Sequence, residues 1–151
     1  MKLKYSRFIF MIVLLFGCTK EADFEEFKEE MLAKQSSYQT HVVAYEEAKE
    51  DNQAEEMLKE LEILYTEATK LSSLYSQYPP PENLTESMLS VFEGASADLS
   101  TAFSLKAEVH QLEKEVLETG LDQQDDINRL KTEANEFEQS GLKKLDRIAS
   151  S

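Results

Sequence analysis

Residues 57–81 read MLKELEILYTEATKLSSLYSQYPPP, and this stretch decides the class of fold. Its apolar residues recur every three or four positions, which predicts one buried stripe along a helix. The stripe comprises Met57, Leu61, Leu64, Ala68, Leu71, Tyr75 and Tyr78. The alternation of four and three continues without a break, as a contact between helices requires. Residues 79–81 end the helix, because proline lacks an amide donor and clashes with the preceding turn.

Similar stripes predict three further helices. One precedes this stretch and begins at Asp23, an N-cap residue with Glu26 at the third helical position. Another begins beside Asn83 and ends at Gly120, a residue suited to a left-handed C-cap. The last begins at Asp122. The predicted core residues of these three helices are Phe24, Phe27, Met31, Tyr38, Tyr45 and Ala48, then Met88, Phe92, Ala95, Leu99, Ala102, Leu105, Val109, Leu112 and Val116, then Ile127, Leu130, Ala134, Phe137, Leu145 and Ile148.

The connections between these helices are short, and short links make neighbouring helices antiparallel. We therefore expect an all-α fold, an up-down bundle of about four long helices. The alternative is an elongated coiled-coil hairpin in which the first two helices merge into one. The polar residues 50–53 favour two separate helices, and Asn52 with Glu55 offers a second capping box there.

The N-terminal segment has a different character. Lys2, Lys4 and Arg7 precede an apolar run of nine residues, 8–16. A membrane-spanning helix needs roughly 20 apolar residues, so this run has the length of a signal-peptide core. The run ends in Leu15-Phe16-Gly17-Cys18, which contains the only cysteine of the chain.

This arrangement resembles the precursors of bacterial lipoproteins, although Phe16 is larger than the residue usual in its position. The resemblance implies that residues 1–17 are removed and that Cys18 receives a diacylglycerol. Residues 18–22 would be a short tether and residues 23–149 an acidic helical domain, lipid-anchored on the extracytoplasmic face of the cell membrane. Two alternatives are an ordinary secretory signal with a chance cysteine and an uncleaved N-terminal anchor.

The net charge of the chain narrows the range of molecules that it could bind. Three of the 16 basic residues precede Cys18 and all 30 acidic residues follow it, so the processed chain would carry a net charge of −17. We expect no nucleic-acid partner, because nucleic acid binds basic patches. The charge also repels anionic lipid headgroups. It would favour a basic partner, or it is simply the solvated surface of the helices.

The sequence offers little chemistry. We expect no catalytic residue, no metal site and no cofactor besides the lipid on Cys18, since nucleophile motifs and Glu-x-x-His pairs are lacking. His41 falls on the seam of the first helix, which leaves two interpretations. It is either a boundary histidine with a hydrogen bond at the seam, or the centre of a small-ligand, metal or haem site inside the bundle.

Tyr75 and Tyr78 stand beside the three prolines and offer an interaction surface, with core-rim tyrosines as the alternative. We therefore expect a non-enzymatic lipoprotein that acts as an interaction or scaffold module. It would be held in the lipid bilayer through Cys18 and would bind an envelope protein or cell-wall polymer. The alternative is a helical-bundle carrier with its site near His41. A third possibility is an envelope hydrolase that uses a carboxylate pair.

Overall fold

The computed structural model describes residues 23–150, and within this range it is built of helices joined by short turns. The helices are α1 (Phe24–Glu50), α2 (Ala54–Gln77), α3 (Glu86–Thr119) and α4 (Gln124–Ala149). None of them combines the length and the apolar character that a membrane-crossing helix needs. The proposed signal segment and Cys18 lie outside the described residues.

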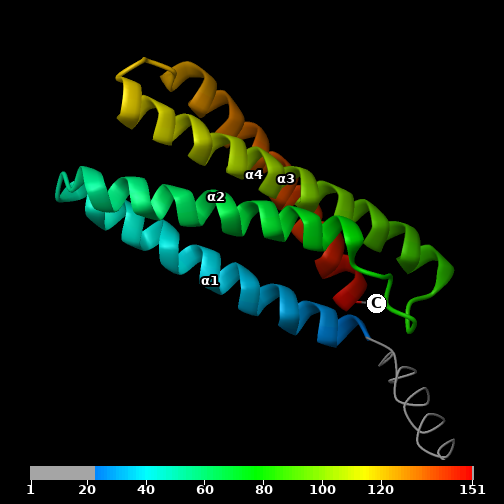
Figure 1. The fold of residues 1–151 in the computed structure, drawn as a ribbon. Helices are drawn as coiled ribbons and strands as arrows, with labels where there is room; N and C mark the ends of the chain where they lie inside the picture. The colour runs from blue at the N-terminus through cyan, green and yellow to red at the C-terminus, as the bar shows by residue number, and fades with distance from the viewer. Residues whose placement is uncertain (1–22, 151) are drawn as a thin grey trace, which may run out of the picture.

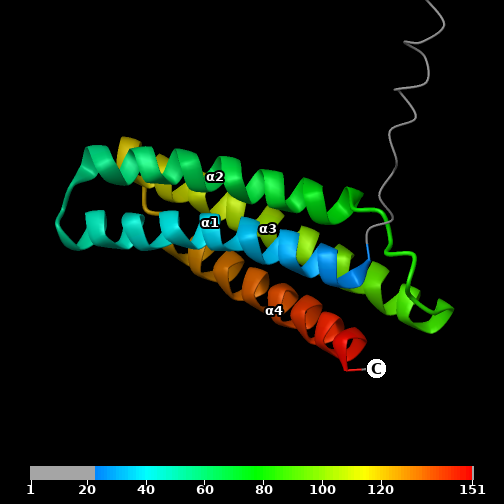
Figure 2. The same cartoon turned by 90° about the horizontal axis from the view of Figure 1, so that it is seen from below.

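The helices form two antiparallel hairpins, α1 with α2 and α3 with α4, and the hairpins pack on each other (Figure 1). The start of α1 and the end of α4 lie at the same end of the molecule in both views (Figures 1 and 2). The prediction of an all-α antiparallel bundle is thus confirmed, and the merged α1–α2 rod is wrong.

The turn between α1 and α2 explains why the two helices are separate. Asn52 has a left-handed backbone, with φ of 54°. Its amide donates to the carbonyl of Lys49 at 3.2 Å, and the amide of Gln53 donates to the carbonyl of Ala48 at 2.9 Å. These two bonds form a Schellman motif, which closes a helix C-terminus. Asn52 therefore ends α1, and the prediction that it caps α2 was wrong.

Asn83 also has a different role from the one expected. The N-cap of α3 is Thr85, whose hydroxyl accepts a hydrogen bond from the amide of Met88 at 3.4 Å. The side chain of Asn83 instead accepts from the amide of Phe24 at 3.1 Å. Asn83 thus ties the start of α1 to the α2–α3 connection. Asp23 and Gly120 cap α1 and α3 as predicted.

The half of the bundle that holds both ends of the helical domain is packed with aromatic rings, and we call it the aromatic end. Its cluster comprises Phe24, Phe27, Tyr75, Phe92 and Phe103. The ring of Phe27 is fully buried, and its centre lies 4.9 Å from the ring centres of both Phe92 and Tyr78, edge to face in each case. Such edge-to-face pairs stabilise a core beyond the area they bury.

Helices α3 and α4 approach each other closely near Gly141. A β-carbon at this position would lie 2.6 Å from Cγ of Leu99 and 3.1 Å from the carbonyl oxygen of Ala95. The small side chain of Ala95 leaves room for this close contact between the helices. Lys144 and Asp98 form an ion pair of 2.6 Å beside this contact.

The other half of the bundle, which contains both hairpin turns, is more open, and we call it the distal half. Figure 1 shows the hairpins separating toward their turns. Val109, Ile127 and Leu130 form a small apolar cluster of their own near the α3–α4 turn. Over Phe24–Glu50 and Gln124–Ala149, α1 and α4 nowhere approach within 8 Å, Cα to Cα. The space between the hairpins is the site described next.

Candidate functional site

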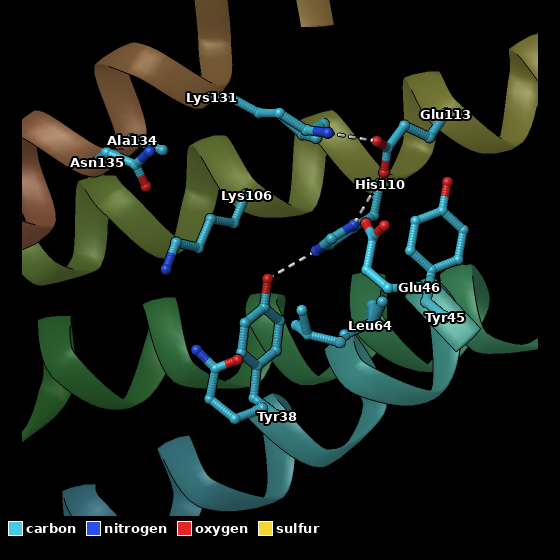
Figure 3. Close-up of a pocket in the computed structure, with 13 residues that line it drawn as sticks. Tyr38, Tyr45, Glu46, Leu64, Lys106, His110, Glu113, Lys131, Ala134 and Asn135 are labelled. Carbon is cyan, nitrogen blue, oxygen red and sulfur yellow. Dashed lines mark hydrogen bonds and ion pairs between the residues drawn. The ribbon is translucent and has the colours of Figure 1, made fainter. Parts of the chain in front are cut away.

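A cavity of about 230 Å³ lies between the hairpins in the distal half. Its walls come from all four helices (Figure 3). Tyr38 and Tyr45 belong to α1, and Leu64 of α2 supplies an apolar patch. The remaining walls come from α3 and α4, and they include His110, Glu113, Lys131 and Asn135. We refer to this space as the polar cavity.

Helix α3 supplies the charged side of the polar cavity because it carries two buried faces. One is the predicted stripe, which includes Leu99 and Val109. The second consists of Phe103, Ala107, His110 and Glu113, all buried and spaced four, three and three residues apart. Sequence reasoning missed this face, although the same spacing in the sequence was a signal for it.

A chain of polar contacts crosses the polar cavity. Tyr38 Oη and His110 Nε2 share a hydrogen bond of 2.7 Å, whose direction depends on the imidazole tautomer. His110 Nδ1 lies 3.5 Å from Glu113 Oε2. This contact is too loose for a hydrogen bond, so the buried Nδ1 has no hydrogen-bond partner within residues 23–150 and only this longer contact with the carboxylate. Glu113 Oε1 accepts a hydrogen bond from Lys131 Nζ at 2.6 Å (Figure 3).

The charges of this chain are set by burial and by neighbours. Burial alone would raise the pKa of Glu113, but the contacts with His110 and Lys131 outweigh it, so the pKa lies below its usual value. Burial raises the pKa of Tyr38, and the charges of Glu138 and Glu113 raise it further. Burial and Glu113 raise the pKa of Tyr45 in the same way. Both phenols therefore stay neutral, and Glu113 stays ionised, at neutral pH.

The positive charge of Lys106 is also compensated by a neighbouring carboxylate. Its Nζ donates to Glu138 Oε1 at 2.7 Å and lies 4.8 Å from the centre of the Phe103 ring. The ion pairs of Lys106 with Glu138 and of Lys131 with Glu113 both join α3 to α4. They hold that hairpin together along the edge of the polar cavity.

His41 lies elsewhere. Its Nδ1 is 2.8 Å from Oε2 of Glu60 on α2, and it is half-buried at the edge of the α1–α2 seam. His41 is not among the residues that line the polar cavity. His41 is thus a hydrogen-bonded histidine at the boundary of the seam, and the histidine that lines the polar cavity is His110.

Tyr75 is not a surface residue. Its side chain is 1% exposed, and its hydroxyl accepts a hydrogen bond from Gln35 Nε2 at 2.6 Å. Its position on the α2 stripe points Tyr75 into the aromatic cluster, and from there it contributes only buried wall to the hollow beside Tyr78 that is described next. Tyr78 is only half-buried.

Tyr78 lines a second hollow, of about 400 Å³, between the end of α2 and the start of α3. Pro80, Phe92 and Ser96 form other parts of its wall. The hydroxyl of Ser96 is buried and has no hydrogen-bond partner in the described chain. We call this hollow the Tyr78 groove. It is the part of the predicted tyrosine surface that the structure retains.

Within residues 23–150, no group of three or more His, Cys, Asp or Glu side chains is placed so that it could hold a metal ion. What the polar cavity offers is hydrogen bonding from several helices beside apolar walls. Comparison with known protein families, with characterised proteins and with solved structures found no match for this chain.

Proposed function

We propose that this protein is a non-enzymatic lipoprotein of the bacterial cell envelope, which presents a helical interaction module on the extracytoplasmic face of the membrane. The observation that carries the proposal is Leu15-Phe16-Gly17-Cys18 directly after a short apolar run. The helical domain supports it by starting at Phe24, capped by Asp23 and tied to Asn83. Residues 18–22 would then be the whole connection between the lipid anchor and the helical domain.

Such a tether fixes which end of the domain is near the membrane. The steps from Cys18 to Asp23 reach at most ~18 Å when extended. The aromatic end, where α1 begins, would therefore face the bilayer, and the polar cavity would face away. The net charge of −17 would keep the domain from lying flat on anionic lipids.

The anchor is tested with Cys18→Ser in the full-length chain. We expect mass spectrometry of the native protein to show a diacylglycerol-modified N-terminal cysteine. We expect the variant to accumulate as unprocessed precursor or to leave the membrane fraction. An unmodified, intact N-terminus in cytosolic material would refute the proposal, as would a variant that is cleaved and retained normally.

The partner surface that we propose is the Tyr78 groove, and the partner is an envelope protein or cell-wall polymer. A photoreactive phenylalanine at position 78, introduced in whole cells, should give a discrete crosslinked species. The same residue in place of Tyr65, which is 43% exposed elsewhere on α2, is the control. Equal crosslinking at the two positions would place the interaction elsewhere.

A second candidate function is that of a small-ligand carrier, and the polar cavity is the observation that favours it. Native mass spectrometry of the purified chain would detect a bound molecule that is released on unfolding. We expect His110→Gln to lose it and His41→Gln to keep it, with circular dichroism confirming that both variants are folded. A chain that is free of ligand after gentle purification, and takes up none in the titrations described below, would exclude this function.

A further inference from the structure

The polar cavity is unsuited to a charged ligand because its own charges already cancel. Lys131 is paired with Glu113 at 2.6 Å, and Lys106 with Glu138 at 2.7 Å. The third carboxylate at the cavity, Glu46, lies 3.7 Å from Lys49. A charged molecule would have to break one of these pairs or remain uncompensated beside the apolar walls. Both alternatives cost free energy beside the apolar walls, although the cavity is open to solvent on one side. The ligand that fits is uncharged.

Several polar groups around the cavity make no hydrogen bond to the described chain. The hydroxyl of Tyr45, a residue that is 5% exposed, makes no hydrogen bond within residues 23–150, and neither does His110 Nδ1. At the mouth, the exposed amide side chains of Gln39 and Asn135 also make none within that range. Each amide and hydroxyl can both donate and accept.

These groups surround the cavity instead of lining one side of it. Tyr45 and Gln39 come from α1, His110 from α3 and Asn135 from α4, and Figure 3 shows Tyr45 and Asn135 on opposite sides. A planar ligand with one polar edge would satisfy one wall only. A molecule with hydroxyls around its whole rim would satisfy several, because each hydroxyl donates and accepts in turn.

The apolar lining and the volume set the rest of the ligand's chemistry. Val42, Leu64, Val109 and Ala134 supply apolar wall beside the two tyrosine rings. The volume of about 230 Å³ is smaller than the roughly 300–1,000 Å³ of pockets for drug-sized ligands, so it suits a single ring. One face of that ring would carry C–H groups against this wall.

We propose that the polar cavity binds a neutral polyhydroxylated ring, the chemistry of one monosaccharide unit, with Tyr45 as a direct hydrogen-bonding partner. This assignment rests on the carrier function proposed second above and names its ligand class. The sugar is either a free monosaccharide or one unit of a polymer. The open side of the cavity, at Gln39 and Asn135, would leave room for the neighbouring units.

Calorimetric titration of the purified full-length chain tests this, in a detergent without a sugar headgroup. The probes are glucose, galactose and N-acetylglucosamine, with glucosamine and glucuronate as charged counterparts and phenol as a ring without the hydroxyl rim. Short soluble N-acetylglucosamine oligomers separate the two sources. We expect saturable binding of at least one neutral sugar, and at least tenfold weaker binding of both charged counterparts. An oligomer that binds more tightly than its monomer identifies the polymer.

The matched variants are Tyr45→Phe and Tyr65→Phe, each of which removes one hydroxyl. Because the Tyr45 hydroxyl has no hydrogen bond in the described chain, its loss should leave the unfolding curve unchanged while weakening sugar binding at least tenfold. Tyr65→Phe should change neither. Undiminished binding to Tyr45→Phe overturns the site. Preference for a charged sugar or for phenol overturns the ligand class but leaves a carrier, and no binding of any probe removes the carrier as well. Lipidation of Cys18 is measured independently of all three outcomes.

Discussion

The aromatic end and the distal half are built from the same four helices but are packed in opposite ways. At the aromatic end, rings interlock around Phe27, and Gly141 lets α4 rest on α3. In the distal half, α3 presents His110 and Glu113 where the aromatic end has phenylalanine. The hairpins separate toward their turns in this half (Figure 1). Polar side chains line the cavity between them (Figure 3).

This difference shows how stability and function are divided along one bundle. Buried apolar area holds the helices together at one end, where the gain per side chain is largest. Buried polar and charged side chains such as His110 and Glu113, which need partners, occupy the other end. The predictions below test whether the two halves are in fact unequal in stability.

The largest expected effect comes from emptying the aromatic end. Phe27→Ala removes a fully buried ring that contacts both Tyr78 and Phe92, and should lower the free energy of unfolding by about 3–5 kcal/mol. Leu130→Ala, in the small distal cluster, should cost only about 2 kcal/mol, because neighbours beside an open cavity can collapse into the space. Urea unfolding of both variants measures the difference. A larger loss in Leu130→Ala would reverse the assignment of the two halves.

The next effect tests the close approach of α3 and α4. Gly141→Ala places a methyl group 2.6 Å from Cγ of Leu99, and overpacking of this kind costs about 1–3 kcal/mol. We expect this cost to exceed the gain of up to about 1 kcal/mol in helix propensity. The midpoint of thermal unfolding should therefore fall.

Gly94→Ala provides the matched control for that substitution, because Gly94 lies in α3 on the same interface. A β-carbon there meets only the flexible end of Lys144, at 3.5 Å, which is ordinary van der Waals contact. The gain in helix propensity then stands alone, and the variant should be more stable by up to about 1 kcal/mol. Equal changes in the two variants would mean that α3 and α4 are not tightly packed at Gly141.

In the distal half, Glu113→Gln should remove part of the pH dependence of the free energy of unfolding. The folded-state pKa of Glu113 is lowered, so its contribution to stability is present above the pKa of the unfolded chain and is lost as the pH falls through the folded-state value. Because the partner Lys131 is partly exposed, we expect this contribution to the free energy of unfolding to be about 1–2 kcal/mol at neutral pH. Unfolding curves between pH 7 and pH 3 measure it.

The variant should be less stable than the parent near pH 7, and the difference should shrink as the pH falls and the parent carboxylate becomes protonated. Asp98→Asn is the useful comparison, since Asp98 also has a lowered pKa and pairs with a lysine of α4, but next to the Gly141 contact. A constant difference between Glu113→Gln and the parent at every pH would show that its ion pair with Lys131 adds no stability.

Much of this fold could be predicted from the sequence, because most helices bury a single stripe. Every core residue predicted for α1 is buried, and only the half-buried Tyr78 departs from the prediction for α2. One apolar period therefore describes nearly all the buried residues of these two helices. The three prolines and Gly120 mark turns through their own backbone chemistry, which needs no tertiary information.

The candidate site could not be predicted in the same way. Helix α3 packs against both α2 and α4, and its second face includes His110 and Glu113, which a search for apolar stripes passes over. The contact between Tyr38 and His110 joins residues that are 72 positions apart. Only the relative rotation of two hairpins brings them together, and no local pattern encodes that rotation.

The smallest effect on stability is expected from substitutions in the two turns of the distal half. These substitutions test whether the turns themselves hold the hairpins apart. Asn52 and Gly120 both have left-handed backbones, with φ of 54° and 73°. Asn52→Gly should raise stability and Gly120→Asn should lower it, each within about 0.5 kcal/mol, because asparagine tolerates this conformation slightly less well than glycine. Thermal unfolding of the two variants and of the double exchange measures these shifts. If the polar cavity owes its opening to side chains of α1, α3 and α4, the double exchange should leave the unfolding midpoint and ligand uptake as they were. A change in ligand uptake would instead show that the caps set the spacing of the hairpins.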